Sequence, residues 1–274
     1  MKNFVLLTNP VKDAAGIVAK KVEDELLAIR SDVSVTIVSG DVESPVFPKE
    51  TECLIALGGD GTMLLAAQKV MGTRIPIIGV NLGHIGYLSE VEETSLTESL
   101  KALCEDKLQV EERMMLSGAV GEKQESALND VVLSRRGDMQ LVGYRVSVNE
   151  RHLYDFYADG MIVSTPTGST GYNLSAGGPI VEPSARLMVL TPVCPHTLQS
   201  RSIVLSPQDQ ITIEILPARG DKFLEVGLSF DGKKAITLGE GEKVSICAAN
   251  EVTRIVKLND TGFLDTLHQK MDHN

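Results

Sequence analysis

The sequence is poor in basic residues and has no long apolar run. Its 274 residues include 26 Lys and Arg against 37 Asp and Glu, a formal net charge of −11. This balance argues against broad, sequence-independent binding to nucleic acid, because such binding needs a basic face. No apolar run approaches the roughly 18 residues that a membrane-spanning helix needs, and the run at 4–7 is too short for a secretory signal. We therefore expect neither nucleic acid nor a membrane as a partner.

Cysteine is also scarce. Cys53, Cys104, Cys194 and Cys247 lie far apart, and the sequence has no Cys-x-x-Cys pair and no cluster of histidines. This spacing disfavours a zinc site and a disulfide framework and suits a reducing compartment. We therefore expect a cytoplasmic protein. Its 43% hydrophobic and 23% charged residues are typical of a globular chain, long enough for one large domain or two of medium size.

The first hundred residues alternate between strand-like and helix-like segments. Apolar or alternating runs predict strands, and apolar residues at helical spacing predict helices. The strands are expected at 4–7, 33–38, 54–57 and 75–80, and the helices at 13–30, 63–71 and 93–104. Strands that alternate with helices imply parallel pairing in a doubly wound layer. The sequence therefore predicts an α/β domain, a parallel sheet with flanking helices, over residues 1–107.

Beyond residue 108 the pattern changes to short β-rich runs separated by turn residues. Such runs occur at 128–133, 141–148, 161–163, 186–190, 203–205, 211–216, 223–226, 235–238 and 244–248. This pattern predicts mostly antiparallel β-structure over residues 108–250. The last segment, 262–271, has the pattern of a short helix.

The strongest local feature is the loop Gly58-Gly59-Asp60-Gly61-Thr62, between a predicted strand and a predicted helix. Its glycines let the backbone approach a ligand closely, and the free N–H groups at a helix N-terminus suit a phosphate. A carboxylate is awkward beside a phosphate unless it binds a metal or handles a proton. Asp60 is therefore the candidate chemical residue. The alternative is an Asp that merely caps the following helix.

Two more familiar nucleotide motifs fail. The dinucleotide fingerprint needs Gly-x-Gly-x-x-Gly, but Leu64 stands where its last glycine is required. Residues 227–234 imitate a P-loop, yet the segment ends in Lys rather than Ser or Thr and lies among short strands. We expect a β-hairpin turn there.

A second polar segment begins at Asp159-Gly160 and continues through residues 164–179, which are rich in Ser, Thr and Gly. So many hydroxyls and glycines predict a backbone-and-hydroxyl cradle for a polar ligand, and Tyr172 can cover an aromatic base. A long surface loop is the alternative. A nucleophilic serine is disfavoured because no Gly-x-Ser-x-Gly elbow is present.

These segments together resemble the NAD kinase family. Residues 58–62 resemble its Gly-Gly-Asp-Gly-Thr motif, which diacylglycerol-kinase-like and phosphofructokinase-like enzymes share. The more specific resemblance extends over about residues 2–265 and rests on residues 81–88, 128–130, 165–178, and 195–198 with Arg201. It implies an α/β domain followed by a β-sandwich domain, with residues 251–274 returning to the first.

The resemblance implies transfer of the terminal phosphoryl group of ATP to the adenosine-ribose 2′-hydroxyl of NAD, giving NADP and ADP. Asp60 would be the general base on that hydroxyl, and a divalent cation, expected to be Mg²⁺, would be required through ligands that the sequence does not identify. The resemblance also implies a homo-oligomer, a dimer or tetramer. The implied substrate-binding residues are Asp60, Gly61, Tyr87, Asn129, Asp130, Asp159, Thr170, Gly171, Tyr172, Asn173, Leu174 and Ser175.

Three positions depart from the family pattern. Asp130 stands where many members have Glu, Leu65 where many have Arg, and Lys233 where Gln is common. None of them touches the expected base. Two alternatives stay open: a lipid or sugar kinase built on the same loop, although no basic or amphipathic membrane surface is evident, and a dinucleotide-binding regulator without turnover.

Overall fold

The chain forms two compact units. The computed structural model describes residues 1–43, 45–82, 86–137, 141–197, 201–217, 225–233, 235–258 and 262–272. One unit comprises Met1–Glu112 with Thr253–Asn274, and the other comprises Arg113–Val252. The chain passes between them within two long strands, β5 (Gln109–Val120) and β16 (Lys243–Lys257).

The first unit is built on a parallel sheet. Its strands are β1 (Asn3–Thr8), β2 (Ser34–Ser39), β3 (Cys53–Leu57) and β4 (Ile77–Val80), in the order β2-β1-β3-β4, and the end of β16 pairs in parallel with β4. Its helices are α1 (Ile17–Ile29), α2 (Asp60–Lys69), α3 (Leu96–Cys104), preceded by the 3₁₀ turn η1 (Glu93–Ser95), and α5 (Phe263–Asp272). The predicted α/β class is confirmed.

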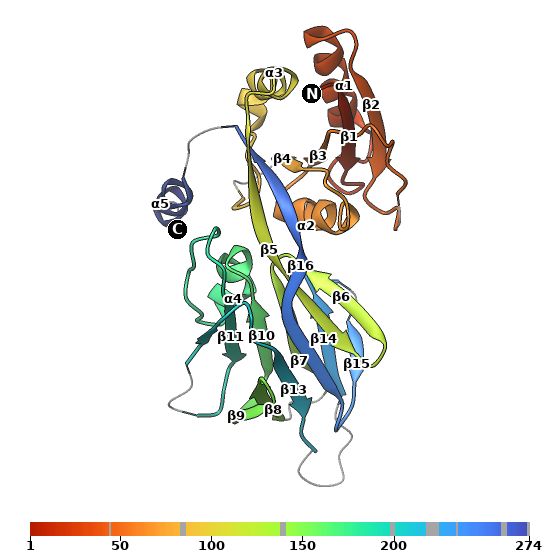
Figure 1. Cartoon of the computed structure of the whole chain (residues 1–274). Helices are drawn as coiled ribbons and strands as arrows, with labels where there is room; N and C mark the ends of the chain where they lie inside the picture. Colours follow the sequence, from red (N-terminus) through yellow and green to blue (C-terminus); the bar gives the residue numbers. More distant parts are fainter. Residues whose placement is uncertain are drawn as a thin grey trace. The chain divides into compact units, whose positions relative to one another are not determined.

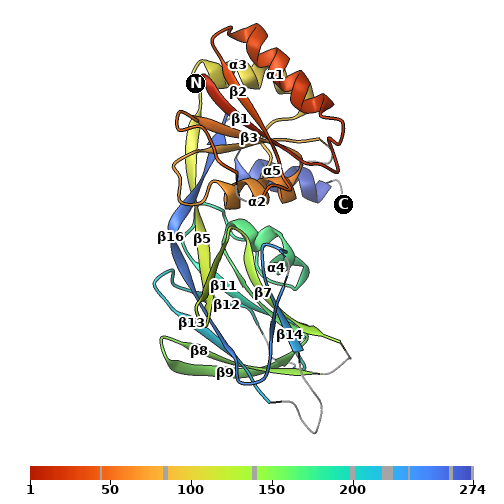
Figure 2. The ribbon, with the colours of Figure 1, turned by 90° about the vertical axis from the view of Figure 1, so that its right-hand side faces the viewer.

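Helices cover both faces of this sheet. Strands β3 and β4 are buried at every residue, which explains why they read as continuous apolar runs rather than alternating ones. Helices α1 and α3 pack together on one face, and α2 lies on the other (Figures 1 and 2). Helix α2 follows closely after the end of β3, and Asp60 is the first residue of the helix.

Two helices start at positions other than those predicted. Helix α1 begins at Ile17 rather than residue 13, because Gly16 adopts a left-handed conformation (φ 66°) and the Asp13 carboxylate accepts the N–H groups of Val18 and Ala19 at 3.0 and 2.9 Å. Helix α2 begins at Asp60 rather than residue 63, so the glycine loop is shorter than expected.

The second unit is an antiparallel β-sandwich, as the family resemblance implied. One sheet has the order β12-β11-β10-β7-β14-β15; in the other, β16 pairs with β13, β13 with β8 and β8 with β9, while β5 pairs with β6. Its elements are β6 (Lys123–Ala127), β7 (Asp130–Arg136), β8 (Val142–Val148), β9 (Arg151–Ala158), β10 (Gly160–Ser164), η2 (Thr167–Thr170), α4 (Tyr172–Ser175), β11 (Met188–Val193), β12 (Ile203–Leu205), β13 (Ile211–Ile215), β14 (Glu225–Phe230) and β15 (Ile236–Leu238). One hydrophobic core contains residues from strands of both sheets.

Three strands, β5, β6 and β9, were not predicted from the sequence. Strand β9 is mostly exposed, so its polar residues do not alternate clearly, and its pairing with β8 is set by a tight turn. Asn149 and Glu150 in that turn both have positive φ, the hairpin geometry that matches the twist of the strands. The predicted hairpin at 227–234 is confirmed over its described part: Asp231 and Gly232, both with positive φ, connect β14 to β15. Residues 223, 224 and 234 lie outside the described ranges.

No helix in the described ranges is long and apolar enough to cross a membrane.

Candidate active site

Asp60 does not cap helix α2. Gly59 is the N-cap residue, and no side chain caps the helix. The Asp60 carboxylate instead accepts the backbone N–H groups of Tyr87, at 2.8 Å, and Leu88, at 3.0 Å. The capping alternative is therefore wrong, and Asp60 is tied to a segment that follows the next strand of the sheet. Gly83, His84 and Ile85, in the same motif, lie outside the described ranges.

Two glycines are required by close packing around this carboxylate. A Cβ on Gly86 would lie 1.9 Å from Asp60 Oδ1, so no side chain fits there. A Cβ on Gly58 would lie 2.1 Å from the Thr62 hydroxyl, which is buried beneath the loop. Gly61, by contrast, is exposed and has nothing within 4 Å of its Cβ position. The loop is therefore packed on its inner side and open at Gly61.

A lysine that the sequence analysis did not consider faces the same loop. Asn9, just after β1, binds the N–H groups of Val11 and Lys12 through Oδ1 and donates from Nδ2 to the Thr62 hydroxyl at 3.1 Å. This turn places Lys12 Nζ 3.2 Å from the Cβ position of Gly59. The pairing of β1 with β3 as neighbouring parallel strands, whose carboxyl ends meet at one edge, brings Lys12 to the loop.

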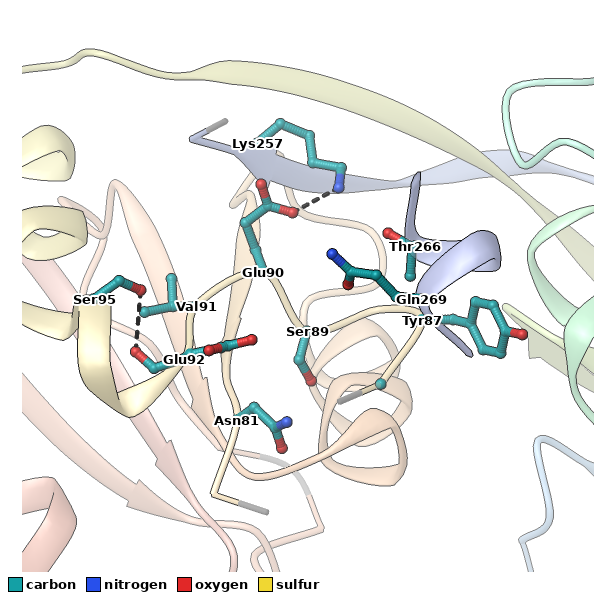
Figure 3. Close-up of a pocket in the computed structure, with 11 residues that line it drawn as sticks. Asn81, Tyr87, Ser89, Glu90, Val91, Glu92, Ser95, Lys257, Thr266 and Gln269 are labelled. Carbon is teal, nitrogen blue, oxygen red and sulfur yellow. Dashed lines mark hydrogen bonds and ion pairs between the residues drawn. The ribbon is translucent and has the colours of Figure 1, made fainter. Parts of the chain in front are cut away.

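A polar cavity of about 200 Å³ lies in the first unit, beside the segment after β4 whose N–H groups bind Asp60 (Figure 3). Its lining combines the segment after β4, the end of β16 and helix α5: Asn81, Gly86, Tyr87, Ser89, Glu90, Val91, Glu92, Ser95, Lys257, Thr266 and Gln269. Ligand pockets usually enclose about 300–1,000 Å³, so this cavity is too small for a dinucleotide. Tyr87 belongs to its wall, and burial, together with the negative charge of Asp60, raises the pKa of the Tyr87 hydroxyl.

In the second unit, Asp231 shapes the turn that carries Asn129 and Asp130. Its carboxylate accepts the N–H groups of Leu128, Asn129 and Asp130 at 2.8, 2.7 and 3.2 Å. The hairpin predicted at 227–234 contains Asp231 but gave no indication of these contacts. The turn leaves the Asn129 side-chain oxygen buried and without a hydrogen-bond partner among the described residues. Asn129 therefore keeps unused capacity for a donor from a ligand.

Asp130 is a buried carboxyl group in an acidic setting. It is only 6% exposed. Burial, and after it the negative charge of Asp231, raises the pKa of Asp130 to about 7. Such a group favours a hydrogen-bond donor, which stabilises the ionised form.

Residues 164–179 pack onto this turn. The Thr165 hydroxyl donates to the Leu128 carbonyl at 2.6 Å, and a Cβ on Gly168 would lie 2.2 Å from the Asn129 carbonyl oxygen. Asn173 is fully buried. Its amide donates to the carbonyls of Ser169 and Pro179, both at 3.0 Å, and accepts the Thr191 hydroxyl at 2.7 Å. Both of its donor hydrogens are thus used inside the loop.

The other predicted residues of this segment lie at the surface. Tyr172 is 46% exposed and Leu174 38% exposed, and Ser175 is also exposed. Thr170 and Gly171 are half-buried beside them. The Thr167 hydroxyl, which the sequence analysis did not single out, is buried without a partner among the described residues. A ligand could reach the exposed rim, while the buried residues hold its shape.

Asp159 forms an ion pair rather than standing alone. Arg135 Nε lies 2.9 Å from its carboxylate, and the two side chains are 25% and 35% exposed. The Arg135 N–H also donates to the Asp159 carbonyl at 3.0 Å. Tyr144, fully buried nearby, has a hydroxyl with no hydrogen-bond partner in the described part of the chain, and burial followed by the charge of Asp159 raises its pKa. Asp159 is therefore largely neutralised within its own unit.

Comparisons with known proteins agree on one family. Residues 41–108 match the model of the ATP-NAD kinase N-terminal domain, and residues 128–258 match that of the C-terminal domain. An NAD kinase of Agathobacter rectalis is 41% identical over 280 residues, covering 99% of both chains. An NAD kinase of Lachnospira eligens is 36% identical, over 99% of this chain and 100% of its own.

Solved structures share the fold. The yeast NADH kinase complexed with NADH matches with a TM-score of 0.86 at 23% identity, over 100% of this chain and 88% of its own. An NAD kinase from Archaeoglobus fulgidus in complex with ATP matches with a TM-score of 0.79 at 25% identity, over 98% of each chain.

The raised pKa of Asp130 predicts a pH-dependent stability. Its pKa of about 7 in the folded protein lies above the value of about 3.9 in an unfolded chain, so stability is lost as pH rises from about 4 to 7. Asp130→Asn removes this loss. From pH 5 to pH 8, the free energy of unfolding of the variant should therefore rise relative to that of the wild type by about 2–3 kcal/mol. Urea unfolding at both pH values measures this difference, and a difference independent of pH would contradict it.

Proposed function

The chain belongs to the ATP-NAD kinase family, and we propose how its own residues carry out that family's reaction. The reaction is transfer of the terminal phosphoryl group of ATP to the adenosine-ribose 2′-hydroxyl of NAD, giving NADP and ADP, and the protein is an enzyme of this class. The lipid-kinase, sugar-kinase and regulator alternatives are thereby set aside. The proposals concern the roles of individual residues.

Asp60 acts as the general base on the ribose hydroxyl. The observation that supports this role is its fixed orientation, because the N–H groups of Tyr87 and Leu88 bind one oxygen each. A carboxylate has about four acceptor sites, so both oxygens can still accept a hydroxyl proton. Phosphoryl transfer asks a protein mainly for positioning and charge neutralisation, and a carboxylate held in this way provides the first.

The open side of the glycine loop binds the phosphates of ATP. Gly61 at the start of α2 presents backbone to solvent, and the helix dipole favours an anion there. Lys12 adds a positive charge opposite Gly59. Gly61, predicted as a substrate-binding residue, is therefore assigned to a contact with the phosphates of ATP.

A divalent cation fits this arrangement. The described residues contain no group of three or more His, Cys, Asp or Glu side chains that could enclose a metal ion. Mg²⁺ usually keeps several waters and is held by substrate phosphates with one or two carboxylates. We propose that Mg²⁺ would enter with ATP, held by the phosphates and by water, and would neutralise charge on the triphosphate, while Asp60 stays available to accept the proton.

The second unit binds the dinucleotide. Asn129 has an unpaired buried oxygen and Asp130 a carboxylate that a hydroxyl donor stabilises, so both suit ribose hydroxyls. Tyr172, with neighbours Thr170, Gly171, Leu174 and Ser175, offers an exposed surface for a base. Asn173 supports the loop from inside, and Asp159 contributes through its ion pair with Arg135.

We also propose that the protein is a homo-oligomer and that it is located in the cytoplasm. The family resemblance supports the homo-oligomer, and the scattered cysteines support a reducing compartment. Light scattering coupled to size-exclusion chromatography gives the oligomer size directly.

The role of Asp60 predicts a loss of turnover without a loss of binding. Asp60→Asn keeps the shape of the side chain but cannot accept the proton, so kcat should fall by at least about 100-fold. NAD affinity, measured by calorimetry, should stay within about threefold. The matched control is Asp24→Asn, on the exposed surface of α1. Normal turnover of Asp60→Asn would remove the base from the mechanism, and loss of NAD affinity would make Asp60 a binding residue.

The role of Lys12 predicts a defect confined to the donor. Lys12→Ala should raise the KM for ATP about tenfold, equivalent to roughly 1.4 kcal/mol, and leave the KM for NAD nearly unchanged. Lys12→Arg should recover most of the loss, because it keeps the charge. Lys20→Ala is the control, since Lys20 is exposed and paired with Glu23. An unchanged KM for ATP in Lys12→Ala would exclude the contact.

A further inference from the structure

The segment that orients Asp60 is itself held by the C-terminal part of the chain. Residues 86–91, which we call the positioning strip, supply the two N–H groups that bind Asp60. On one side the strip pairs with the end of β4: the N–H groups of Glu90 and Val91 donate to the Gly79 carbonyl at 3.2 and 3.0 Å. This side is ordinary backbone pairing. The other side depends on side chains.

A buried ion pair joins the strip to the end of β16. Lys257 Nζ lies 2.6 Å from Glu90 Oε2, and the Leu258 N–H lies 3.4 Å from Glu90 Oε1 (Figure 3). The Glu90 side chain is only 7% exposed and that of Lys257 23%. Removing Lys257 takes away a charged hydrogen bond from a carboxylate that is largely buried, so the Glu90 side chain is held less firmly.

Helix α5 contacts the strip at a second point. Lys270 Nζ lies 4.1 Å from the centre of the Tyr87 ring, within the range of a cation–π interaction. Thr266 and Gln269 of the same helix line the polar cavity described above. Ser89 of the strip also lines this cavity, and its buried hydroxyl has no hydrogen-bond partner among the described residues. The cavity gives the strip room to shift if its anchors are lost. The side-chain anchors therefore add restraint on the side of the strip that faces the cavity.

We propose that Glu90 and Lys257 are positioning residues for catalysis: their ion pair fixes the strip whose N–H groups orient the Asp60 carboxylate. The inference rests on the proposed role of Asp60 as the base. Neither residue touches substrate in this scheme. A displacement of about 1 Å at a reacting group can cost 100-fold in rate, whereas the unit as a whole is held by an extensive core, of which Val91 is the strip's member. The pair should therefore affect turnover far more than folding.

The test compares variants that break and keep the pair. Lys257→Met should lower kcat by about 10–100-fold, with the KM values for NAD and ATP within about twofold of wild type. Lys257→Arg should restore kcat to within about threefold, because it keeps the charge. The matched control is Arg254→Met. Arg254 lies on the same strand, is 24% exposed and pairs with Glu112 at 2.9 Å, but it does not contact the strip. Its loss should leave kcat unchanged.

Three further measurements make the outcome decisive. Gly86→Ala, which would push directly on Asp60 Oδ1, is the positive control and should show the same loss of kcat. If Lys257→Met does not fold, Glu90→Gln carries the test, because it removes the charge of the other partner of the ion pair; kcat should fall by about 10–100-fold at unchanged KM. Melting temperatures of all variants show whether turnover and stability change together.

The possible failures can be told apart. Normal kcat in Lys257→Met, or a loss equal to that in Arg254→Met and parallel to the change in melting temperature, overturns the positioning role while Asp60→Asn remains inactive. Normal turnover in Asp60→Asn overturns the proposed base, and with it this inference. A kcat loss in Lys257→Met that Lys257→Arg restores, at unchanged KM, supports the ion pair as the anchor of the strip.

Discussion

A carboxylate that accepts backbone N–H groups organises the candidate residues in each of the two units. Asp60 binds two such groups, from Tyr87 and Leu88, and Asp231 binds three, from residues 128–130. Hydrogen bonds to a charged group contribute about 1.5–3 kcal/mol each, which is enough to fix a turn that no regular secondary structure holds. In each unit the acidic side chain thus organises a segment that secondary structure alone would leave loosely defined.

The fold class and the position of the glycine loop could be predicted because both are local in sequence. Buried parallel strands read as apolar runs, and glycines after a strand mark a turn into a helix. The partners of Asp60 could not be predicted, since Tyr87 and Leu88 follow another strand and their N–H groups leave no mark in the sequence. Strand β9 was missed for a related reason: it is mostly exposed, and only its pairing with β8 makes it a strand.

The candidate site residues divide in the same way. Ser, Thr and Gly density correctly marked residues 164–179 as a distinctive loop, but composition could not separate Asn173, buried and fully engaged, from the exposed Tyr172. Asp231 was correctly predicted in a hairpin turn, where it has positive φ, but its contacts with residues 128–130 could not be read from the sequence, because those residues lie about 100 positions away. Lys12 was overlooked because sequence distance hides the shared edge of β1 and β3.

Unused hydrogen-bonding capacity separates Asn129 and Thr167 from Asp231 and Asn173 in the second unit. The Asp231 carboxylate accepts three N–H groups, and the Asn173 amide donates both of its hydrogens to carbonyls of its own loop. The Asn129 oxygen and the Thr167 hydroxyl are buried without partners among the described residues, an arrangement that costs about 1–3 kcal/mol for each group. Native proteins keep few such groups, so a ligand that satisfies them recovers free energy that folding left unused. In the proposed function, part of the affinity for a polar ligand therefore comes from hydrogen bonds to these two groups.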